Sequence, residues 1–381
     1  MPELPEVETI RRGLKPVQDR RIDAAEFRLP RLLLGVKADK LAAMLRGQRI
    51  QAVLRRGKYL ILELDRDTLI FHLGMTGQVT HAPKDAREDD RFRRTVTGMQ
   101  KAVGVHPVDA HTHAILHLDD GSRVQFRDPR TFGKIIFVAG HDWQDHPRVS
   151  KLGDEPLDLK VAPFLAANYP ASSSRSIKSL LLDQSFLAGV GNIYADEALF
   201  DSGIHPKRRV STVTPDERTR LLESVKMVLR HGIKHQGTTF SDYRKPDGSS
   251  GDNYERLKVY GRGGLPCRNC KTLLIKIVVA QRGTVFCPQC QPNQHKRIVR
   301  AEGRPPVPNK RTAAEKKTCH EKFCGQIFPA CAYLNQRLPW TLWVTSRRPF
   351  WRSSAIRICA PQSHRPWPIP IALTPACNRW I

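Results

Sequence analysis

Hydrophobic residues recur at helical spacing close to the N-terminus of the chain. This apolar face consists of Val7, Ile10 and Leu14. Pro5 suits the first position of a helix, and the acidic residues at positions 6 and 8 favour the positive end of its dipole. The pattern predicts an opening helix with Pro2 and Glu3 at its N-terminal end.

Short apolar runs broken by turn residues follow between about residues 50 and 138. Asp120 and Gly121 separate two such runs, which indicates a β-hairpin. We therefore predict an antiparallel β-sandwich or barrel in this part. The segment from about 81 to 108 is polar, charged and without a period, so we expect a long surface loop there.

The pattern becomes helical from about residue 161 to Gly237. Thr214-Pro215-Asp216-Glu217 has the form of a capping box with proline at the first helical position, and Gly237 offers a stop. Gly189-Val190-Gly191-Asn192 precedes a further predicted helix at residues 193 to 200. Because a glycine-flanked helix start exposes backbone N–H groups, we expect that it can hold a phosphate.

The last part of the chain, residues 291 to 381, has no sustained period. It contains 12 prolines and five of the six tryptophans, and its 16 Lys and Arg against 3 Asp and Glu give a net charge of +13. Such a segment is hard to fold around a core of its own. We interpret it as a disordered basic tail, or as sequence translated from a shifted frame.

Net charge points to a polyanionic partner. The whole chain carries 63 Lys and Arg against 37 Asp and Glu, a formal +26, which would attract nucleic acid first of all. Ribosomal, RNA-binding and membrane-surface proteins share this property, so the net charge indicates a class of partner but does not identify an activity.

Nothing in the sequence indicates secretion or a membrane span. The first six residues are acidic and lack the basic and apolar regions of a secretory signal, and no apolar stretch approaches the roughly 20 residues that cross a bilayer. We expect a cytoplasmic protein that does not bind membranes. In that reducing compartment the nine cysteines are better explained as metal ligands or free thiols than as disulfides.

Four of these cysteines form two matched pairs. Two residues separate Cys267 from Cys270, two separate Cys287 from Cys290, and sixteen lie between the pairs. This spacing places two thiolate pairs on two turns of a hairpin, as a tetrahedral zinc site requires. With four cysteine ligands the site is closed, so we predict one structural zinc ion rather than a catalytic one.

The N-terminus offers a candidate nucleophile. If Met1 is removed, Pro2 presents a secondary amine, and an α-amino group titrates near pH ~8. The positive end of a helix lowers that value further, so a partly neutral amine can attack an electrophilic carbon and form a Schiff base. Glu3 and Glu6 beside it could move protons. From these residues alone, a simple helix start explains the pattern better.

Ordered sequence motifs extend from residue 2 to about 291. The opening Met1-Pro2-Glu3-Leu4-Pro5-Glu6-Val7-Glu8-Thr9 resembles the start of bacterial formamidopyrimidine-DNA glycosylases. Further family blocks follow in order: Arg56-Gly57-Lys58-Tyr59-Leu60, His72-Leu73-Gly74-Met75-Thr76-Gly77, Asp128-Pro129-Arg130-Thr131-Phe132-Gly133, Gly189-Val190-Gly191-Asn192-Ile193-Tyr194-Ala195, Gly203-Ile204-His205-Pro206, Val259-Tyr260-Gly261-Arg262 and Ala280-Gln281-Arg282. Many ordered motifs make the resemblance specific.

The resemblance implies a bifunctional enzyme of base excision repair and a role for each catalytic residue. Pro2 would attack C1′ of the damaged nucleotide and Glu3 would assist loss of the base, with Glu6 as possible support. Lys58 would donate protons or contact phosphate during β-elimination, although the residue alone reads as an ordinary strand lysine. Arg282 would grip phosphate and support δ-elimination.

The resemblance also implies a set of DNA contacts. Met75, Arg130 and Phe132 would fill the gap left by the extruded base, although without the family Met75 and Phe132 would be assigned to the core. Asn192 and Lys178 would hold the DNA backbone at the helix-two-turns-helix motif. His111 falls where the family has a DNA-contacting histidine, but lone histidines are usually structural.

Three features depart from the family pattern. The charged loop after Gly77 is longer than usual, and Thr131 stands where a second basic residue is often found. Residues 292 to 381 have no counterpart. The lesion-covering loop, somewhere within residues 238 to 251, has a sequence that we cannot map onto base specificity.

We therefore predict an α+β fold in four parts. These are an N-terminal catalytic β-sandwich with an opening helix (2–148), a helix-two-turns-helix domain (149–255), a zinc-finger β-hairpin (256–291) and a disordered basic tail (292–381). The expected partner is double-stranded DNA with 8-oxoguanine, formamidopyrimidines or abasic sites. We expect a monomer, associated with the bacterial nucleoid.

Two alternatives stay open. An endonuclease VIII type enzyme would act on oxidised pyrimidines, although Leu4 and the pair Arg130 and Phe132 favour the purine enzyme. A zinc-bearing DNA-binding protein without catalysis would share the charge and the cysteines, but it would form no covalent intermediate with DNA.

Overall fold

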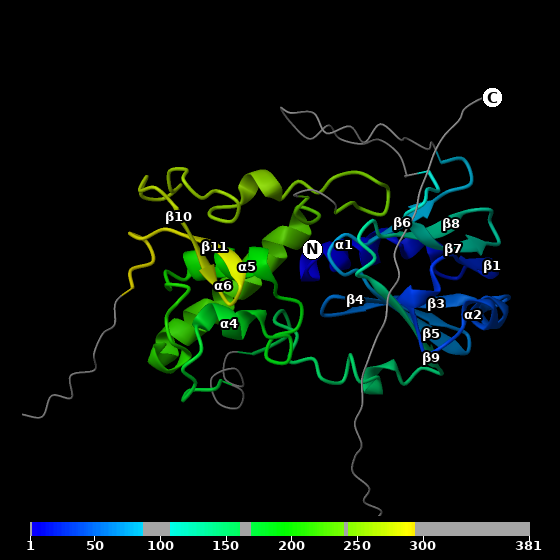
Figure 1. Ribbon diagram of the computed structural model, residues 1–381, viewed down its shortest axis with the longest axis horizontal. Helices are drawn as coiled ribbons and strands as arrows, with labels where there is room; N and C mark the ends of the chain where they lie inside the picture. The colour runs from blue at the N-terminus through cyan, green and yellow to red at the C-terminus, as the bar shows by residue number, and fades with distance from the viewer. Residues whose placement is uncertain (1, 87–106, 161–168, 240–242, 294–381) are drawn as a thin grey trace, which may run out of the picture. The chain divides into compact units, whose positions relative to one another are not determined.

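The structure, a computed structural model of the chain, describes residues 2–86, 107–160, 169–239 and 243–293 (Figure 1). The predicted tail lies outside these residues except for 292 and 293, as do Met1, most of the predicted surface loop, the first part of the predicted helical region and three residues of the lesion-covering loop. Within the described part of the chain, no helix combines the length and apolar character needed to cross a membrane.

Two β-sheets face one another in the N-terminal part and confirm the predicted sandwich. One has the order β2-β9-β5-β4-β3 and the other the order β1-β7-β8-β6. The strands are β1 (Ile22–Phe27), β2 (Leu33–Leu34), β3 (Ile50–Arg56), β4 (Tyr59–Leu64), β5 (Asp67–His72), β6 (Gln78–Ala82), β7 (Thr112–Leu118), β8 (Arg123–Arg127) and β9 (Lys134–Ala139). β2 runs parallel to β9, and the other neighbouring strands are antiparallel. The core lies between the sheets, where the rings of Phe71 and Phe126 are 5.9 Å apart.

The five-stranded sheet is covered on both faces, which explains its unbroken apolar runs. Leu69 and Phe71 point into the sandwich core, whereas Ile70 packs on the opposite face with a second cluster that includes Trp143 and Val149. Asp120 and Gly121 form the predicted turn between β7 and β8, and Gly121 has the positive φ of 78° that such turns favour.

The sequence did not reveal the elements between residues 22 and 45. Strand β1 is an edge strand whose residues after Ile22 are half-buried or exposed, so it lacks the apolar run used to find the other strands. Helix α2 (Ala38–Leu45) is short, and its buried face consists of only Leu41 and Leu45.

Helices form the next part of the chain, as predicted. Together with the opening helix, they are α1 (Leu4–Gly13), α4 (Ile177–Leu182), α5 (Asn192–Asp201) and α6 (Pro215–Lys234). The capping box of α6 is present, since Thr214 Oγ1 accepts from Glu217 N at 3.3 Å and Glu217 Oε2 accepts from Thr214 N at 2.9 Å. The opening helix α1 packs between strands β3, β4 and β6 on one side and α6 on the other (Figure 1).

A two-stranded hairpin follows, with β10 (Ile275–Val279) and β11 (Arg282–Phe286). Its turn residues Ala280 and Gln281 have φ values of 50° and 57°. Two consecutive positive φ angles are those of a type I′ turn, which Asn-Gly would adopt with less strain. Strain of this kind at a loop tip is typical of functional sites.

Candidate active site

The N-terminus of α1 meets the N-terminus of α5. Leu4 N donates to Gly189 O at 3.0 Å. The Glu3 carboxylate accepts from the first-turn amides of α5, from Ile193 N at 2.9 Å and Tyr194 N at 3.4 Å. The chain's own carboxylate therefore occupies two amides of this positive helix end, and the expectation that the helix start holds a phosphate stays a prediction for its other amides.

Gly191 makes this approach possible. A Cβ atom at position 191 would lie 2.3 Å from Cδ and 2.5 Å from Oε1 of Glu3, far inside van der Waals contact. The glycine is therefore required by the close approach of Glu3, and the adjacent Gly189 has in addition a φ of +91°.

Replacing Gly191 with alanine is expected to displace Glu3 from the α5 amides. If the chain excises damaged bases, as its resemblance implies, the excision rate should fall by roughly 100-fold, since ~1 Å misplacements have effects of this size. Single-turnover kinetics on a DNA duplex with a damaged base would measure it. Gly283→Ala is the matched control, because a Cβ there meets nothing nearer than Lys276 Cε at 3.9 Å. Equal rates for the two variants would contradict the assignment.

Glu6 lies fully buried behind Glu3. Its Oε1 accepts from Tyr194 Oη at 2.8 Å and Thr238 N at 2.7 Å, and its Oε2 accepts from Glu3 N at 2.9 Å. Burial and the nearby charge of Glu3 raise the pKa of Glu6, and these hydrogen bonds limit the rise. The carboxyl is thus fixed directly against the peptide that follows Pro2, which is itself buried.

Lys58 approaches the same carboxylates from the turn between β3 and β4. It is 7% exposed, and burial lowers its pKa; Glu3 and Glu6 oppose that shift and Arg282 adds to it. Gly57, next to Lys58, packs on Gly189, whose carbonyl accepts from Leu4 N, and Gly283, next to Arg282, accepts from Asn192 at the start of α5. The four predicted groups Glu3, Glu6, Lys58 and Arg282 therefore lie around the place where α1 and α5 begin.

Glu155, which the sequence did not single out, fixes the turn that carries Lys58. Its carboxylate accepts from Gly57 N at 2.6 Å and from Arg55 and Arg56 at 2.9 to 3.2 Å. Gly57 has a φ of +55° and packs on Ala188. No local pattern marks Glu155, because its partners lie about a hundred residues away.

Arg282 is exposed at the tip of the β10–β11 hairpin, which α4 and α5 hold in place. Lys178 Nζ donates to Asp196 Oδ1 at 2.5 Å, Thr284 Oγ1 at 2.7 Å and Gly283 O at 3.3 Å, and Asn192 Nδ2 donates to Gly283 O at 2.9 Å. The Lys178 side chain is 0% exposed. Its three protons are used within the protein, so Lys178 braces the hairpin in this structure, and its DNA contact stays a prediction.

Met75, Arg130 and Phe132 form a second group, organised by Asp128. The Asp128 carboxylate accepts from Thr76 Oγ1, from Gly133 N at 2.7 Å and from Arg130 N at 3.3 Å. Phe132 is 52% exposed, with the Arg130 guanidinium 4.9 Å from its ring centre. The alternative that Phe132 belongs to the core is therefore wrong, whereas Met75 is half-buried.

Thr131 between them has a φ of +55°, which is rare for a β-branched residue. Its hydroxyl accepts from Arg31 Nη2 at 2.9 Å. A guanidinium thus lies beside the position where the sequence lacks the expected second basic residue.

His111 lies exposed just before β7, and its backbone N donates to Asp109 Oδ1 at 3.0 Å. His113, which was not predicted, is buried with Nε2 3.0 Å from Asp128 O. Of these two histidines, only His111 is accessible, and its DNA contact remains a prediction.

The four predicted zinc ligands come together at the open end of the hairpin. Cys267 and Cys270 lie on a turn before β10, Cys287 and Cys290 on a turn after β11, and all four Sγ atoms are within 4.8 Å of one another. Three Sγ–Sγ distances are 3.4, 3.5 and 3.9 Å. Thiolates placed tetrahedrally at about 2.3 Å from zinc are about 3.8 Å apart, so the cluster fits the ion.

Three family models match successive parts of the chain. The formamidopyrimidine-DNA glycosylase N-terminal domain matches residues 1–135, and the H2TH domain of the same glycosylases matches residues 152–244. A zinc finger found in FPG and IleRS matches residues 264–293.

Relatives and solved structures agree with these models. A formamidopyrimidine-DNA glycosylase of Heliobacterium modesticaldum is 41% identical over 293 residues, covering 76% of this chain and all of the relative. One of Stenotrophomonas maltophilia is 39% identical over 296 residues, with 76% and 100% covered. The Lactococcus lactis FPG (MutM) in complex with Fapy-dG DNA has a TM-score of 0.65 at 33% identity, covering 76% of this chain and 100% of that chain. MutM (FPG) of Thermus thermophilus has a TM-score of 0.63 at 39% identity, with 76% and 98% covered.

Proposed function

Because the chain belongs to the formamidopyrimidine-DNA glycosylase family, we propose that it excises oxidised purines from duplex DNA and then cleaves the strand at the abasic site. The observation that carries this proposal is the gathering of Glu3, Glu6, Lys58 and Arg282 around the start of α1. A protein that only binds DNA has no need of buried carboxyls and a buried lysine at its N-terminus.

Pro2 supplies the nucleophile once Met1 has been removed. Its nitrogen bonds to C1′ as the bond from C1′ to the base nitrogen breaks, and the base leaves with a proton that Glu3 helps to deliver. The first product is an aminal in which C1′ bears both the Pro2 nitrogen and O4′. The C1′–O4′ bond then breaks as O4′ takes up a proton, which leaves an iminium between Pro2 and the opened sugar. Glu3 lies one residue from this nitrogen and is fixed by the α5 amides.

Strand cleavage follows from the same iminium. Loss of a proton from C2′ expels the 3′ phosphate, and a second elimination expels the 5′ phosphate. Lys58, whose pKa burial lowers, is a group that can move protons in these steps. Arg282, at the hairpin tip, is accessible to a phosphate.

DNA binding is assigned to the groups around this centre. Met75, Arg130 and Phe132 would enter the space of the extruded base, since an exposed aromatic ring beside a guanidinium suits unstacked DNA. Asn192 and His111 would contact the backbone, and Lys178 would act through the hairpin that it braces.

The zinc ion supplies no chemistry to the reaction, since four cysteines close its coordination sphere. It would hold the ends of the hairpin that carries Arg282.

We propose that the chain is divided into domains at 2–148, 149–255, 256–291 and 292–381. We also propose that it acts on nucleoid DNA in the bacterial cytoplasm, which the bacterial relatives support.

Lesion choice tests the proposal against an enzyme for oxidised pyrimidines. The chain is expected to release 8-oxoguanine opposite cytosine, and formamidopyrimidines, at least about tenfold faster than thymine glycol, a difference of about 1.4 kcal/mol in transition-state binding. Single-turnover release from matched duplexes would measure this. Faster release of thymine glycol would overturn the substrate assignment, and no release of any lesion would overturn the enzyme assignment.

A further inference from the structure

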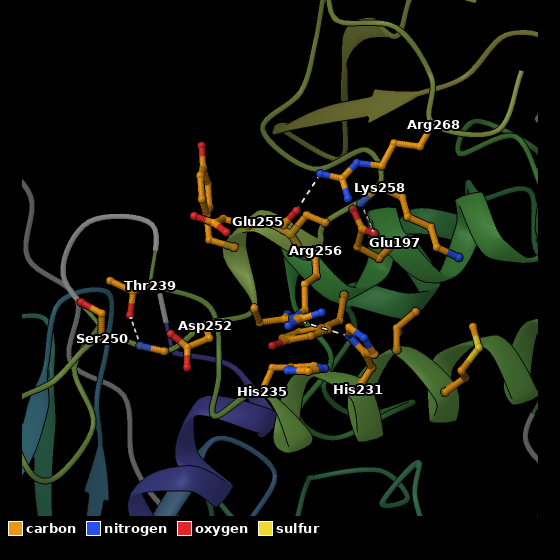
Figure 2. Close-up of a pocket in the computed structure, with 17 residues that line it drawn as sticks. Glu197, His231, His235, Thr239, Ser250, Asp252, Glu255, Arg256, Lys258 and Arg268 are labelled. Carbon is orange, nitrogen blue, oxygen red and sulfur yellow. Dashed lines mark hydrogen bonds between the residues drawn. The ribbon is translucent and has the colours of Figure 1, made fainter. Parts of the chain in front are cut away.

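An open cavity of about 1080 Å³ lies on the face of α6 where the chain runs from residue 250 to 258. Figure 2 shows His231 and His235 side by side on α6, with Arg256 facing them. The two imidazole rings are 4.4 Å apart. The proposed reaction uses none of these groups, but the backing of the cavity includes Tyr194, which contacts Glu6.

A chain of hydrogen bonds leads from His231 to Glu6. His231 Nδ1 is 3.2 Å from Asn253 Oδ1, and Asn253 Nδ2 donates to Thr238 Oγ1 at 2.8 Å. Thr238 Oγ1 is 3.2 Å from Tyr194 Oη, which lies 2.8 Å from Glu6 Oε1. Four side chains from α6, the following segments and α5 thus connect the cavity to the catalytic centre.

The chemistry of each group fixes the direction of this chain. Tyr194 has one proton and donates it to Glu6, so the 3.2 Å contact requires Thr238 to donate to the tyrosine oxygen. Thr238 in turn accepts from the Asn253 amide, whose oxygen accepts from His231. Every proton therefore points toward the Glu6 carboxyl, and bonds aligned in this way strengthen one another.

The inner part of the chain is shielded from water. Asn253 and Thr238 are each 3% exposed, and Tyr194 and Glu6 are each 1% exposed. A buried donor that loses its acceptor has no water to replace it, so the arrangement resists rotation of any one group. Glu6 in turn holds Glu3 N, the amide directly after Pro2.

We propose that Asn253 and Thr238 are positioning residues for the nucleophile, acting through Tyr194 and Glu6 on the Pro2–Glu3 peptide. The proposal rests on the proposed function, because it assumes that Pro2 reacts. It assigns a catalytic consequence to two side chains that are connected to Glu6 only through Tyr194. The backbone amide of Thr238 donates a separate hydrogen bond to Glu6, so Thr238 acts on this carboxyl both directly and through Tyr194.

Asn253→Asp is the sharpest variant, because it keeps the shape and replaces the amide donor by an acceptor. Thr238 would then donate to the new carboxylate, and Tyr194 would lose its partner. The single-turnover excision rate is expected to fall by roughly 10- to 100-fold, with the Kd for lesion DNA unchanged within about twofold. Thr238→Val should behave alike, and Thr238→Ser should restore most of the rate because it returns the hydroxyl.

The pH profile gives a readout that simple destabilisation would not move. Hydrogen bonds to Glu6 lower its pKa against the effects of burial and of Glu3. A weaker bond from Tyr194 and a new negative charge both raise that pKa, so the acidic limb of the rate profile should shift to higher pH in Asn253→Asp. Asp252→Asn is the control, since this exposed neighbour lines the same cavity without joining the chain.

Each outcome decides one point. A wild-type enzyme that excises, with Asn253→Asp and Thr238→Val within twofold of its rate and an unmoved acidic limb, would overturn the positioning proposal. A fall in rate accompanied by an equal loss of DNA affinity and of thermal stability, without rescue by Thr238→Ser, would also overturn it. A wild type that releases no base would overturn the proposed function instead.

Discussion

Replacing Pro2 with glycine is expected to abolish trapping of the protein on lesion DNA by borohydride and to lower the rate of base release on the order of 10³-fold or more. The proline ring fixes the nitrogen, and its secondary amine gives an iminium that stays cationic without a further proton. Glycine loses both properties, while Glu6 still holds the peptide of Glu3. Gel detection of the reduced adduct and single-turnover release of 8-oxoguanine would measure the two effects.

DNA binding is the internal control for this variant. Lys58, Arg282 and the group around Phe132 are unchanged, so the Kd for a duplex with an uncleavable abasic analogue should stay within about threefold of the wild type. Retained trapping in Pro2→Gly would contradict the assignment of the nucleophile. A loss of trapping that accompanies an equal loss of DNA binding would show only that the N-terminus had been displaced.

Removing zinc should produce the other large effect. The hairpin is hydrogen-bonded to Lys178, Asn192 and Asp196 and packs on Phe200 and His205, but structural zinc in small fingers supplies roughly 10 kcal/mol or more of folding free energy. Chelation, or Cys287→Ser, should therefore unfold residues 264–293 while the sandwich stays folded. Because Arg282 lies at the hairpin tip, the affinity for lesion DNA should fall at least about tenfold.

Limited proteolysis and DNA titration would measure these changes, with bound zinc determined by metal analysis. Cys377→Ser is the matched control, since this cysteine is not one of the four ligands; it should bind one zinc ion and DNA like the wild type. A zinc-free protein with an intact hairpin and unchanged affinity would show that the metal has no structural role.

Local patterns predicted the fold where the signal lies within a few residues. The zinc ligands follow from the spacing of Cys267, Cys270, Cys287 and Cys290, and the start of α6 follows from its capping box. Helix α2 and strand β1 were not predicted. Helix α2 buries only two leucines and β1 is a largely exposed edge strand, so neither has a clear hydrophobic period.

The catalytic residues could be named from family motifs, but their environment could not be predicted. Glu6 is hydrogen-bonded to Tyr194 and Thr238, which lie 188 and 232 residues away in the sequence. Contacts at such separations cannot be predicted from the local hydrophobic pattern. The sequence predicts a phosphate at the N-terminus of α5, because its glycines can be recognised in the sequence. That Glu3 accepts hydrogen bonds from the α5 amides can be seen only in the structure. Whether Phe132 is buried likewise depends on the loop that Asp128 organises, which only the fold reveals.

Mapping the covalent bond tests the central claim most directly. The wild-type protein would be trapped with borohydride on a duplex containing 8-oxoguanine, digested with trypsin and sequenced by tandem mass spectrometry. The account predicts a reduced sugar adduct on the N-terminal nitrogen of a peptide that begins at Pro2. An adduct on Lys58, another amine close to Glu3 and Glu6, or no adduct at all, would contradict it.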